Sequence, residues 1–266
     1  MARPIIAVLT DFGLRDHYVG SMKGVMLGIC PDAVIVDVTH EVPAHDVRWG
    51  AAVLAAAYRD YPAGTIFLAV VDPGVGTTRR AVAAEAAGYL FVAPDNGLTS
   101  AVFDASPPDR VVELANRRFA RADVSRTFEG RDRFGPAAAW LATGVELAEL
   151  GPAIPASSLV RLRLAAPEAD AGGVRGEIVL VDRFGNLVTN IDRRALDRVR
   201  VQDGATVEVG DRRARLVSTY DEGRPGELCA LVGSAGTVEI AMNGTSAASA
   251  TGLGPGARVI ISPACD

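Results

Sequence analysis

Three segments of the chain place carboxylate, amide and glycine residues directly after short apolar runs. Carboxylates and amides bind hydroxyl groups, and a positioned carboxylate also takes a proton from water. Turn formation alone explains many such residues, because Asp, Asn, Pro and Gly all favour turns. Three such segments, each beginning where an apolar run stops, favour a shared ligand cleft: TDFG (10–13), DPGVG (72–76) and PDNG (94–97).

The patterns of several common catalytic chemistries are missing from the sequence. It contains no GxGxxG after the first apolar run and no GxxxxGK[ST], which disfavours standard dinucleotide and nucleoside triphosphate sites. The DFG triplet lacks the other kinase elements, and GSAG (233–236) is not a nucleophile elbow. His17, His40 and His45 lack metal-ligand spacing, and the 3 cysteines form no CxxC pair. We therefore expect no metal and no cofactor, and either direct displacement or simple binding.

The elements that must position these residues alternate between strand and helix in the first part of the chain. The expected strands are 5–9, 34–38 and 65–71, and the expected helices are 18–29 and 47–58. This alternation with short turns predicts an α/β domain with a largely parallel sheet, over residues 1–165. Ligands bind beyond the ends of the strands in such sheets, which is where the three polar segments lie.

The second part of the chain has a different pattern. An Ala-, Gly- and acid-containing stretch at 166–173 is predicted to be a linker. Residues 174–266 contain short apolar runs separated by Gly, Asp and Asn, which predicts a small β-barrel-like domain. The expected strands are 176–182, 205–209, 214–217, 228–232, 238–241 and 257–261.

Composition narrows the classes of partner. The 266 residues carry a net charge of −5, which argues against non-specific nucleic-acid binding. No apolar run is long enough to span a bilayer, and the N-terminus lacks the long apolar region of a signal peptide. We therefore expect a cytoplasmic protein that acts on a small molecule, with neither nucleic acid nor membrane as a partner.

Six motifs in order resemble the S-adenosyl-L-methionine hydroxide adenosyltransferases, a family related to the fluorinases and chlorinases. The resemblance extends from about residue 4 to residue 262. The motifs are TDFG with DHYVGSMKG (10–13 and 16–24), VDPGVGTTRR (71–80), APDNGL (93–98), TFEGRD (127–132), DRFGNLVTN (182–190) and GSAGTVEIAMNG (233–244). The resemblance implies an N-terminal α/β domain, a C-terminal β-barrel-like domain and a homotrimer. It also implies that the ligand lies between domains of neighbouring subunits.

The same resemblance implies substrate-binding roles for eight residues. Asp11 matches the family aspartate that accepts hydrogen bonds from the ribose hydroxyls, and Asp16 falls where the family contacts the methionine portion. The barrel-domain residues match motifs that hold the methionine group and read the adenine: Asp182, Phe184, Asn186, Ser234, Met242 and Asn243. Turn formation is the alternative for Asn186 and Asn243.

The water-splitting members of the family use an Asp–Arg–His set near the 5′ carbon of the substrate. Asp72 and Arg79 match the first two members, while Glu129 stands where the family usually has histidine. The resemblance implies hydrolysis to adenosine and methionine, with Asp72 orienting the water and Arg79 fixing its carboxylate. Glu129 either replaces the histidine or only pairs with Arg131 or Arg79, and both alternatives stay open.

Two other functions remain as alternatives. A non-catalytic sensor of S-adenosyl-L-methionine or adenosine is one, because the usual histidine is missing. A halogenase is less favoured, because halogenating relatives carry a tyrosine where this chain has Asp72. A carboxylate 4 Å from a halide would repel it by about 4 kcal/mol at an effective dielectric near 20. Fluorinases also carry an inserted loop near 86–89, where only a tight turn fits here.

Overall fold

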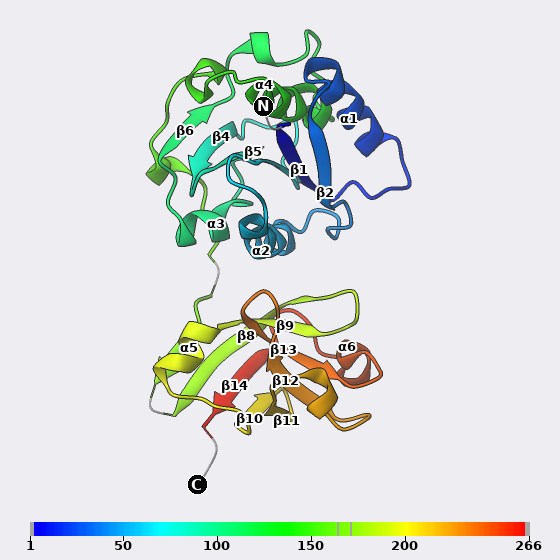
Figure 1. Cartoon of the computed structure of the whole chain (residues 1–266), viewed down its shortest axis with the longest axis vertical. Helices are drawn as coiled ribbons and strands as arrows, with labels where there is room; N and C mark the ends of the chain where they lie inside the picture. The colour runs from blue at the N-terminus through cyan, green and yellow to red at the C-terminus, as the bar shows by residue number, and fades with distance from the viewer. Residues whose placement is uncertain (1–2, 164, 171, 264–266) are drawn as a thin grey trace. The chain divides into compact units, whose positions relative to one another are not determined.

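The fold was analysed in a computed structural model that describes residues 3–163, 165–170 and 172–263. The chain divides into two compact units, Met1–Leu162 and Arg163–Asp266, which we call unit 1 and unit 2 (Figure 1). Strand β7 (Glu168–Asp170) belongs to unit 2 and falls inside the segment predicted as a linker. The division into domains at 1–165 and 174–266, with a linker at 166–173, remains a prediction.

Unit 1 is built on a six-stranded sheet with the order β2-β1-β3-β5-β4-β6. The strands β2, β1, β3 and β5 run parallel, whereas β4 is antiparallel to β5 and β6. The prediction of an α/β domain with a largely parallel sheet is therefore confirmed. The strands are β1 (Ile5–Thr10), β2 (Val34–Thr39), β3 (Ile66–Val70), β4 (Ala81–Ala86), β5 (Tyr89–Pro94) and β6 (Arg110–Glu113).

Helices cover both faces of this sheet (Figure 1). Because successive side chains of a strand point to opposite faces, Ile6 and Val8 of β1 enter one core while Ala7 and Leu9 enter the other. The first core is closed by α1 and α4, and the second by α2 and α3. These helices are α1 (Tyr18–Ile29), α2 (Val47–Ala57), α3 (Ser100–Ala105) and α4 (Gly135–Ala142).

Strands β4 and β5 are joined by a two-residue turn. Ala87 and Gly88 both have positive φ, at 53° and 79°. This combination is typical of the tight type I′ turn, whose twist matches that of a β-hairpin. The expected tight turn between the two strands is confirmed.

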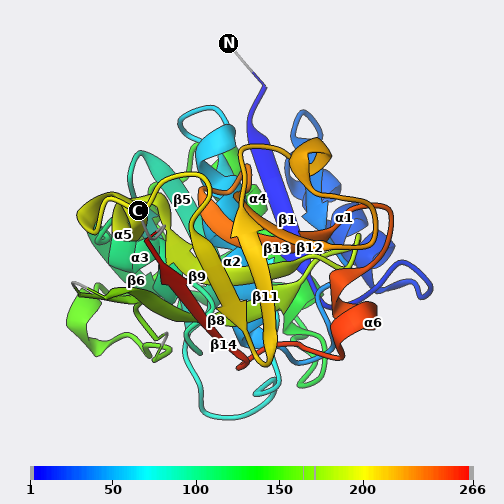
Figure 2. The ribbon, with the colours of Figure 1, turned by 90° about the horizontal axis from the view of Figure 1, so that it is seen from below.

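Unit 2 is a closed barrel of seven strands. Its sheet runs β14-β10-β11-β12-β13-β9-β8-β7, and β14 also pairs with β8, which closes the ring and leaves β7 beside it. In Figure 2, β14 (dark red) lies alongside β8. The barrel strands are β8 (Gly173–Val181), β9 (Leu187–Asp192), β10 (Thr206–Val209), β11 (Arg212–Leu216), β12 (Leu228–Val232), β13 (Thr237–Met242) and β14 (Arg258–Ser262). The predicted β-barrel-like second domain is confirmed.

The barrel encloses an apolar core with one inward side chain at every second position. Residues such as Val207, Val209, Val259 and Ile261 are fully buried. Two short helices, α5 (Arg193–Arg198) and α6 (Ala247–Thr251), pack against it. Within the part of the chain that the structure describes, no helix combines the length and apolar character needed to cross a membrane.

Candidate functional site

The loop after β3 holds an acidic and a basic side chain together. Arg79 Nε donates to Asp72 Oδ1 across 2.8 Å, and Arg79 Nη2 donates to Asp72 Oδ2. The pair is thus a two-point arginine–carboxylate contact, which fixes the plane of the carboxylate as well as its position. Gly76 has φ +78° and lies against the backbone carbonyl of Arg126, so a side chain at this position would clash.

Glu129 reaches the same arginine from a distant part of unit 1. Arg79 Nη2 donates to Glu129 Oε2 across 2.7 Å, and Arg133 lies 3.8 Å from the other carboxylate oxygen. Arg131 is not a partner of Glu129, because it donates to Asp132. Of the two predicted partners of Glu129, the structure therefore brings Arg79 to it and not Arg131.

A short π-helix, η3 (Gly130–Phe134), follows Glu129 and is anchored by hydrogen bonds to the Asp132 side chain. The Asp132 side chain is fully buried and accepts hydrogen bonds from Arg121, from Arg131 and from the backbone N–H of Ser125. All these donors surround one carboxylate, so the segment from 121 to 132 is held as a unit. This places Glu129 beside the loop after β3. Turns of π-helix are frequent at functional sites.

The three side chains of this site are nearly excluded from water. The exposed fractions of the Arg79, Asp72 and Glu129 side chains are 10%, 5% and 9%. Burial raises the pKa of Asp72 above its ordinary value; the charge of Glu129 adds to this effect and the hydrogen bonds from Arg79 oppose it. Burial acts to lower the pKa of Arg79, but its bonds to both carboxylates outweigh this and raise it. The Arg79 guanidinium thus forms hydrogen bonds with both nearly buried carboxylates, Asp72 and Glu129.

Asp11 lies at the same edge of the sheet as Asp72. Asp11 follows β1 and Asp72 follows β3, and these strands are parallel neighbours with Thr10 opposite Val70. Asp11 Oδ2 accepts a hydrogen bond of 2.8 Å from the backbone N–H of His45. Asp16 is exposed in the loop before α1, so the structure gives it no fixed partner among the described residues.

Aromatic side chains adjoin these polar groups in sequence and in contact. The Phe12 ring is 5.9 Å from the Phe128 ring and 6.2 Å from the Tyr18 ring, measured between centroids. The Arg79 guanidinium stacks 5.1 Å from the centroid of Phe134. Tyr18 remains 42% exposed although it is large and largely apolar. Apolar walls of this kind lower the local dielectric and strengthen the charge interactions beside them.

The third polar segment, PDNG (94–97), forms hydrogen bonds to other loops of unit 1. Asp95 accepts hydrogen bonds from Arg80 at 2.6 and 2.9 Å and from the backbone N–H of Val160 at 2.8 Å. Asn96 donates to the carbonyl of Val71 across 2.8 Å. Their polar atoms support the neighbouring loops, so turn formation and bracing explain this segment.

Three of the predicted barrel residues meet in the loop between β8 and β9. Asp182 Oδ1 accepts from the backbone N–H groups of Phe184 and Asn186, at 2.9 and 2.8 Å, and Oδ2 accepts from Asn186 Nδ2 at 2.9 Å. This leaves the amide oxygen of Asn186 and its second N–H without a partner in the loop. Phe184 is 79% exposed, which is unusual for a large apolar side chain.

The other three barrel residues lie near the ends of β12 and β13. Ser234 is exposed in the turn between these strands, and Met242 is half-buried at the end of β13. Asn243 Nδ2 donates to the carbonyl of Gly223 across 2.9 Å, so it braces the loop that precedes β12. The structure therefore joins Asp182, Phe184 and Asn186 in one loop but does not link Ser234 directly to them.

Sequence reasoning missed a polar pair in unit 2. The hydroxyl of Tyr220 donates to Glu239, and burial together with this carboxylate raises the pKa of Tyr220 well above its usual range. Tyr220 is 48% exposed and adjoins the loop braced by Asn243. No residue type or spacing singles out this pair, because its members are far apart in sequence. Among the described residues, no group of three or more His, Cys, Asp or Glu side chains is arranged to hold a metal ion.

Comparisons with known proteins agree over nearly the whole chain. Residues 6–151 match the family model described as SAM hydroxide adenosyltransferase N-terminal domain, and residues 176–260 match that of the C-terminal domain. An (R)-S-adenosyl-L-methionine hydrolase of Salinispora tropica is 44% identical, with 96% of this chain and 97% of the relative covered. A fluorinase of Actinoplanes is 32% identical, with 98% of both chains covered.

A solved structure shows that the similarity extends to the three-dimensional fold. The crystal structure of an uncharacterized conserved protein from Thermotoga maritima superposes with a TM-score of 0.91 at 37% identity, covering 96% of this chain and 99% of that one. Both units match their family models, the resemblance found in the motifs extends over the full fold, and relatives above 30% identity cover almost all of the chain. The chain therefore belongs to the SAM hydroxide adenosyltransferase family.

Proposed function

We propose that this protein hydrolyses S-adenosyl-L-methionine to adenosine and L-methionine by attack of water at the 5′ carbon. The observation that carries the proposal is the nearly buried set of Asp72, Arg79 and Glu129, in which one guanidinium holds two carboxylates. Relatives at 42–44% identity are named (R)-S-adenosyl-L-methionine hydrolases, so we propose the (R) epimer as the preferred substrate.

The chemistry requires a positioned water and a proton acceptor. The sulfonium group is already a good leaving group, so no acid is needed to expel methionine. The water oxygen forms a bond to the 5′ carbon while the carbon–sulfur bond breaks, and its electron pair remains on sulfur as a neutral thioether. A carboxylate takes the proton that the water loses. Alignment and a positioned base together supply much of the rate, the base about 10²- to 10⁴-fold.

Asp72 is the residue we assign as that base. Its raised pKa makes its carboxylate a stronger proton acceptor than an exposed aspartate, while the contact with Arg79 keeps its orientation. Glu129 shares Arg79 with it and would orient the same water, in the place of the family histidine. The two carboxylates repel each other electrostatically, and this repulsion is one cause of the raised pKa of Asp72.

The binding residues divide between the two units. In unit 1, Asp11 would accept hydrogen bonds from the ribose hydroxyls and Asp16 would contact the methionine portion. In unit 2, the amide oxygen and second N–H of Asn186, which have no partner in the loop, would help to hold the methionine group and part of the adenosine. The remaining assigned positions are Asp182 and Phe184 in the same loop, and Ser234, Met242 and Asn243 near the ends of β12 and β13.

We further propose a homotrimer whose active sites use unit 1 of one subunit and unit 2 of its neighbour. Exposed apolar side chains occur in both units, at Leu14 and Tyr18 in unit 1 and at Phe184 in unit 2. Burial of such side chains is a common driving force for association. The buried thiols Cys30 and Cys229 are free, which is consistent with our placing the protein in a reducing cytoplasm.

The halogenase alternative is disfavoured by two observations. The two nearly buried carboxylates that we assign to the site of attack would repel a halide, and the β4–β5 connection is a two-residue turn rather than an inserted loop. The sensor alternative predicts binding without turnover. The same assay decides between them.

The decisive experiment is incubation of the purified protein with each resolved epimer in ¹⁸O-labelled water. We expect adenosine labelled at its 5′ hydroxyl, with faster turnover of the (R) epimer. Recovery of unchanged substrate would support the sensor, and 5′-methylthioadenosine, adenine or a halogenated nucleoside as main product would contradict the assigned reaction.

A further inference from the structure

His40 is a buried imidazole that the proposed chemistry does not use. Its side chain is 1% exposed, and each ring nitrogen faces a polar partner. Nδ1 lies 2.8 Å from the hydroxyl of Thr10, and Nε2 lies 3.0 Å from Asp37 Oδ1, at an angle outside that of a good hydrogen bond. Buried polar side chains are costly unless they are paired, so a fully enclosed histidine requires an explanation.

An irregularity in β2 places this imidazole against β1. The parallel pairing sets Val8 opposite Asp37 and then Leu9 opposite Thr39, so Val38 is an extra residue. A bulge of this kind reverses the faces that the following residues point to, and bulges often re-aim a side chain beside a functional site. Beyond it, His40 meets Thr10, the residue immediately before Asp11.

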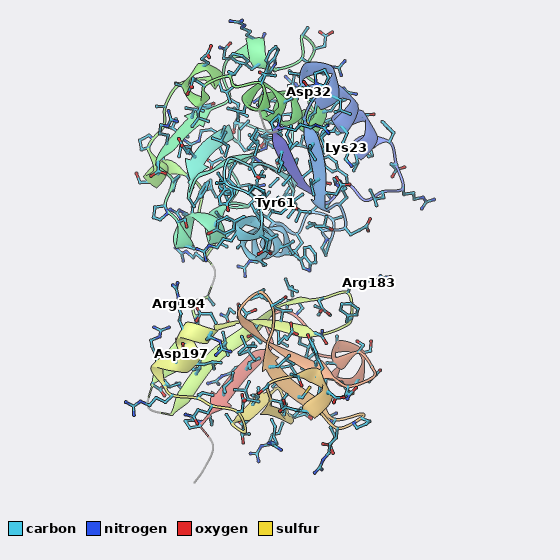
Figure 3. The ribbon with its side chains drawn as sticks, in the orientation of Figure 1. Lys23, Asp32, Tyr61, Arg183, Arg194 and Asp197 are labelled. Carbon is cyan, nitrogen blue, oxygen red and sulfur yellow. The ribbon has the colours of Figure 1, made fainter. Side chains whose placement is uncertain are left out.

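The hydrogen bonds around Thr10 and His40 fit one arrangement of donors and acceptors. The backbone N–H of Phe12 donates to Thr10 Oγ1 across 3.2 Å, which leaves the hydroxyl proton of Thr10 for His40 Nδ1. In that arrangement His40 carries its proton on Nε2, which lies near the Asp37 carboxylate without a well-angled hydrogen bond to it. Asp37 in turn accepts from Lys23 across 2.7 Å; burial acts to raise the pKa of Asp37, but Lys23 and His40 outweigh it and hold the pKa below its usual value. Figure 3 marks Lys23 on α1.

The segment that precedes α2 therefore holds the loop after β1 at three points. His40 holds Thr10 through its ring, and its carbonyl accepts from the backbone N–H of Gly13 at 2.8 Å. The backbone N–H of His45 donates to the Asp11 carboxylate, also at 2.8 Å. His45 has φ +68°, a left-handed conformation that is uncommon outside glycine. The backbone of the loop that carries Asp11 is therefore fixed, which suits the proposed role of Asp11 in binding the ribose hydroxyls.

We propose that His40 is a positioning residue, and that the chain Asp37–His40–Thr10 orients the 10–13 loop so that the Asp11 carboxylate is set for ligand binding. The inference rests on the proposed function for the role of Asp11, but not for the Asp37–His40–Thr10 contacts themselves. His40 touches no reacting atom in this scheme and acts only through Thr10 and Gly13.

The test uses Thr10→Val, which keeps the shape of the side chain and removes the hydroxyl, with Thr10→Ser as the conservative rescue. The matched control is Thr39→Val, because the Thr39 hydroxyl also accepts one backbone N–H, from Glu41 at 3.0 Å, outside this chain. Asp37→Asn is a second variant whose half-exposed position leaves the core intact. The measurements are amide exchange at Phe12 and Gly13, the ¹⁵N signature of the His40 ring, and KM and kcat.

For Thr10→Val we expect about 10-fold faster amide exchange at Phe12, and a KM raised about 10-fold with kcat changed less than about 3-fold. Thr10→Ser and Thr39→Val should match the parent, and Asp37→Asn should shift KM in the same direction by about 3-fold. The parent ring should show a bare Nδ1. A protonated Nδ1 in the parent, or parental exchange and KM in Thr10→Val, would overturn the proposal. If the parent hydrolyses nothing, the proposed function fails, while the exchange and ¹⁵N measurements still test the Asp37–His40–Thr10 contacts.

Discussion

Arg79 Nη2 lies 2.7 Å from Glu129 Oε2, and this contact joins the loop after β3 to the start of the π-helix η3. The same nitrogen also donates to Asp72, so the arginine is the only described cation in direct contact with both carboxylates. Any change in one member of the set alters the charge balance felt by the other two. The first two predictions use this dependence.

The first prediction concerns Glu129. If Glu129 orients the water, Glu129→Gln should lower kcat by at least about 10-fold with little change in KM, as expected for a group that acts mainly in the transition state. Because the charge of Glu129 contributes to the raised pKa of Asp72, the acidic limb of the pH–rate profile should move to lower pH in this variant. Steady-state kinetics across pH provide both measurements.

Two further variants control this experiment. Glu129→His restores the usual family residue and should retain activity. Glu85→Gln breaks an exposed pair with Arg110, whose side chains are 33% and 55% exposed, and should leave kcat unchanged. A parental rate and profile in Glu129→Gln would leave Asp72 and Arg79 as the whole catalytic set.

The second prediction concerns the stability that Arg79 provides. Arg79→Met leaves two nearly buried carboxylates without their shared cation, so we expect a loss of about 3–5 kcal/mol near neutral pH. Without the arginine, burial and the charge of Glu129 raise the pKa of Asp72 further in the folded state, because the opposing hydrogen bonds are lost. The folded state then binds more protons than the unfolded state, so the deficit should shrink as the pH falls through the raised pKa of Asp72.

Thermal unfolding of the variant and the parent between neutral and mildly acid pH measures this effect. The control is Arg110→Met, which breaks an exposed pair with Glu85 and should change the stability little, because exposed ion pairs are weak. A deficit in Arg79→Met that is independent of pH would contradict the account of a cation shared by buried carboxylates.

The third prediction concerns the loop between β8 and β9. Asp182→Ala removes the acceptor of three hydrogen bonds that shape the loop and hold Asn186. The loop must then be ordered when substrate binds, which should raise KM about 10-fold, equivalent to about 1.4 kcal/mol, with a smaller effect on kcat. Asp192→Ala is the matched control, because Asp192 caps α5 with one hydrogen bond outside this loop. Equal KM values in the two variants would remove the special role of Asp182.

The fourth prediction concerns the shared active site. Asp11→Ala and Asn186→Ala each disable one half of the proposed site, so each variant should be inactive alone. Mixed under conditions that allow subunit exchange, they should regain part of the parental activity, because some mixed interfaces combine two intact halves. Light scattering gives the assembly state. A monodisperse monomer with full activity would be incompatible with the proposal.

The five strands and helices predicted between residues 5 and 71 lie close to those observed, because their signals are local. The helix predicted at 18–29 is α1 (Tyr18–Ile29) without change, and the strand at 5–9 extends by one residue to Thr10. Strand β9 (Leu187–Asp192) was not predicted, because Asn190 and Asp192 are poor strand formers. Pairing with β8 on one side and β13 on the other overrides that preference. Such pairing is set by the barrel and not by the strand itself.

The candidate site was predictable in part. The family resemblance assigned Asp72 and Arg79 as a pair, and the structure joins them across seven positions of one loop. The contact of Arg79 with Glu129 spans 50 positions and depends on the anchoring of η3 by Asp132, which no pattern reveals. The bulge that turns His40 toward Thr10 is likewise a property of strand pairing.

Closure of the barrel through β14 and β8 has a consequence for biosynthesis. Strand β8 is the first strand of the barrel, yet one of its two barrel partners, β14, follows every other strand of unit 2. All strands and the four longer helices of unit 1 precede β8, so unit 1 has its whole core available while unit 2 is still incomplete. During translation one edge of β8 therefore remains unpaired until β14 has been synthesised. An unpaired strand edge can pair with other chains, so the nascent chain is prone to aggregation during this interval.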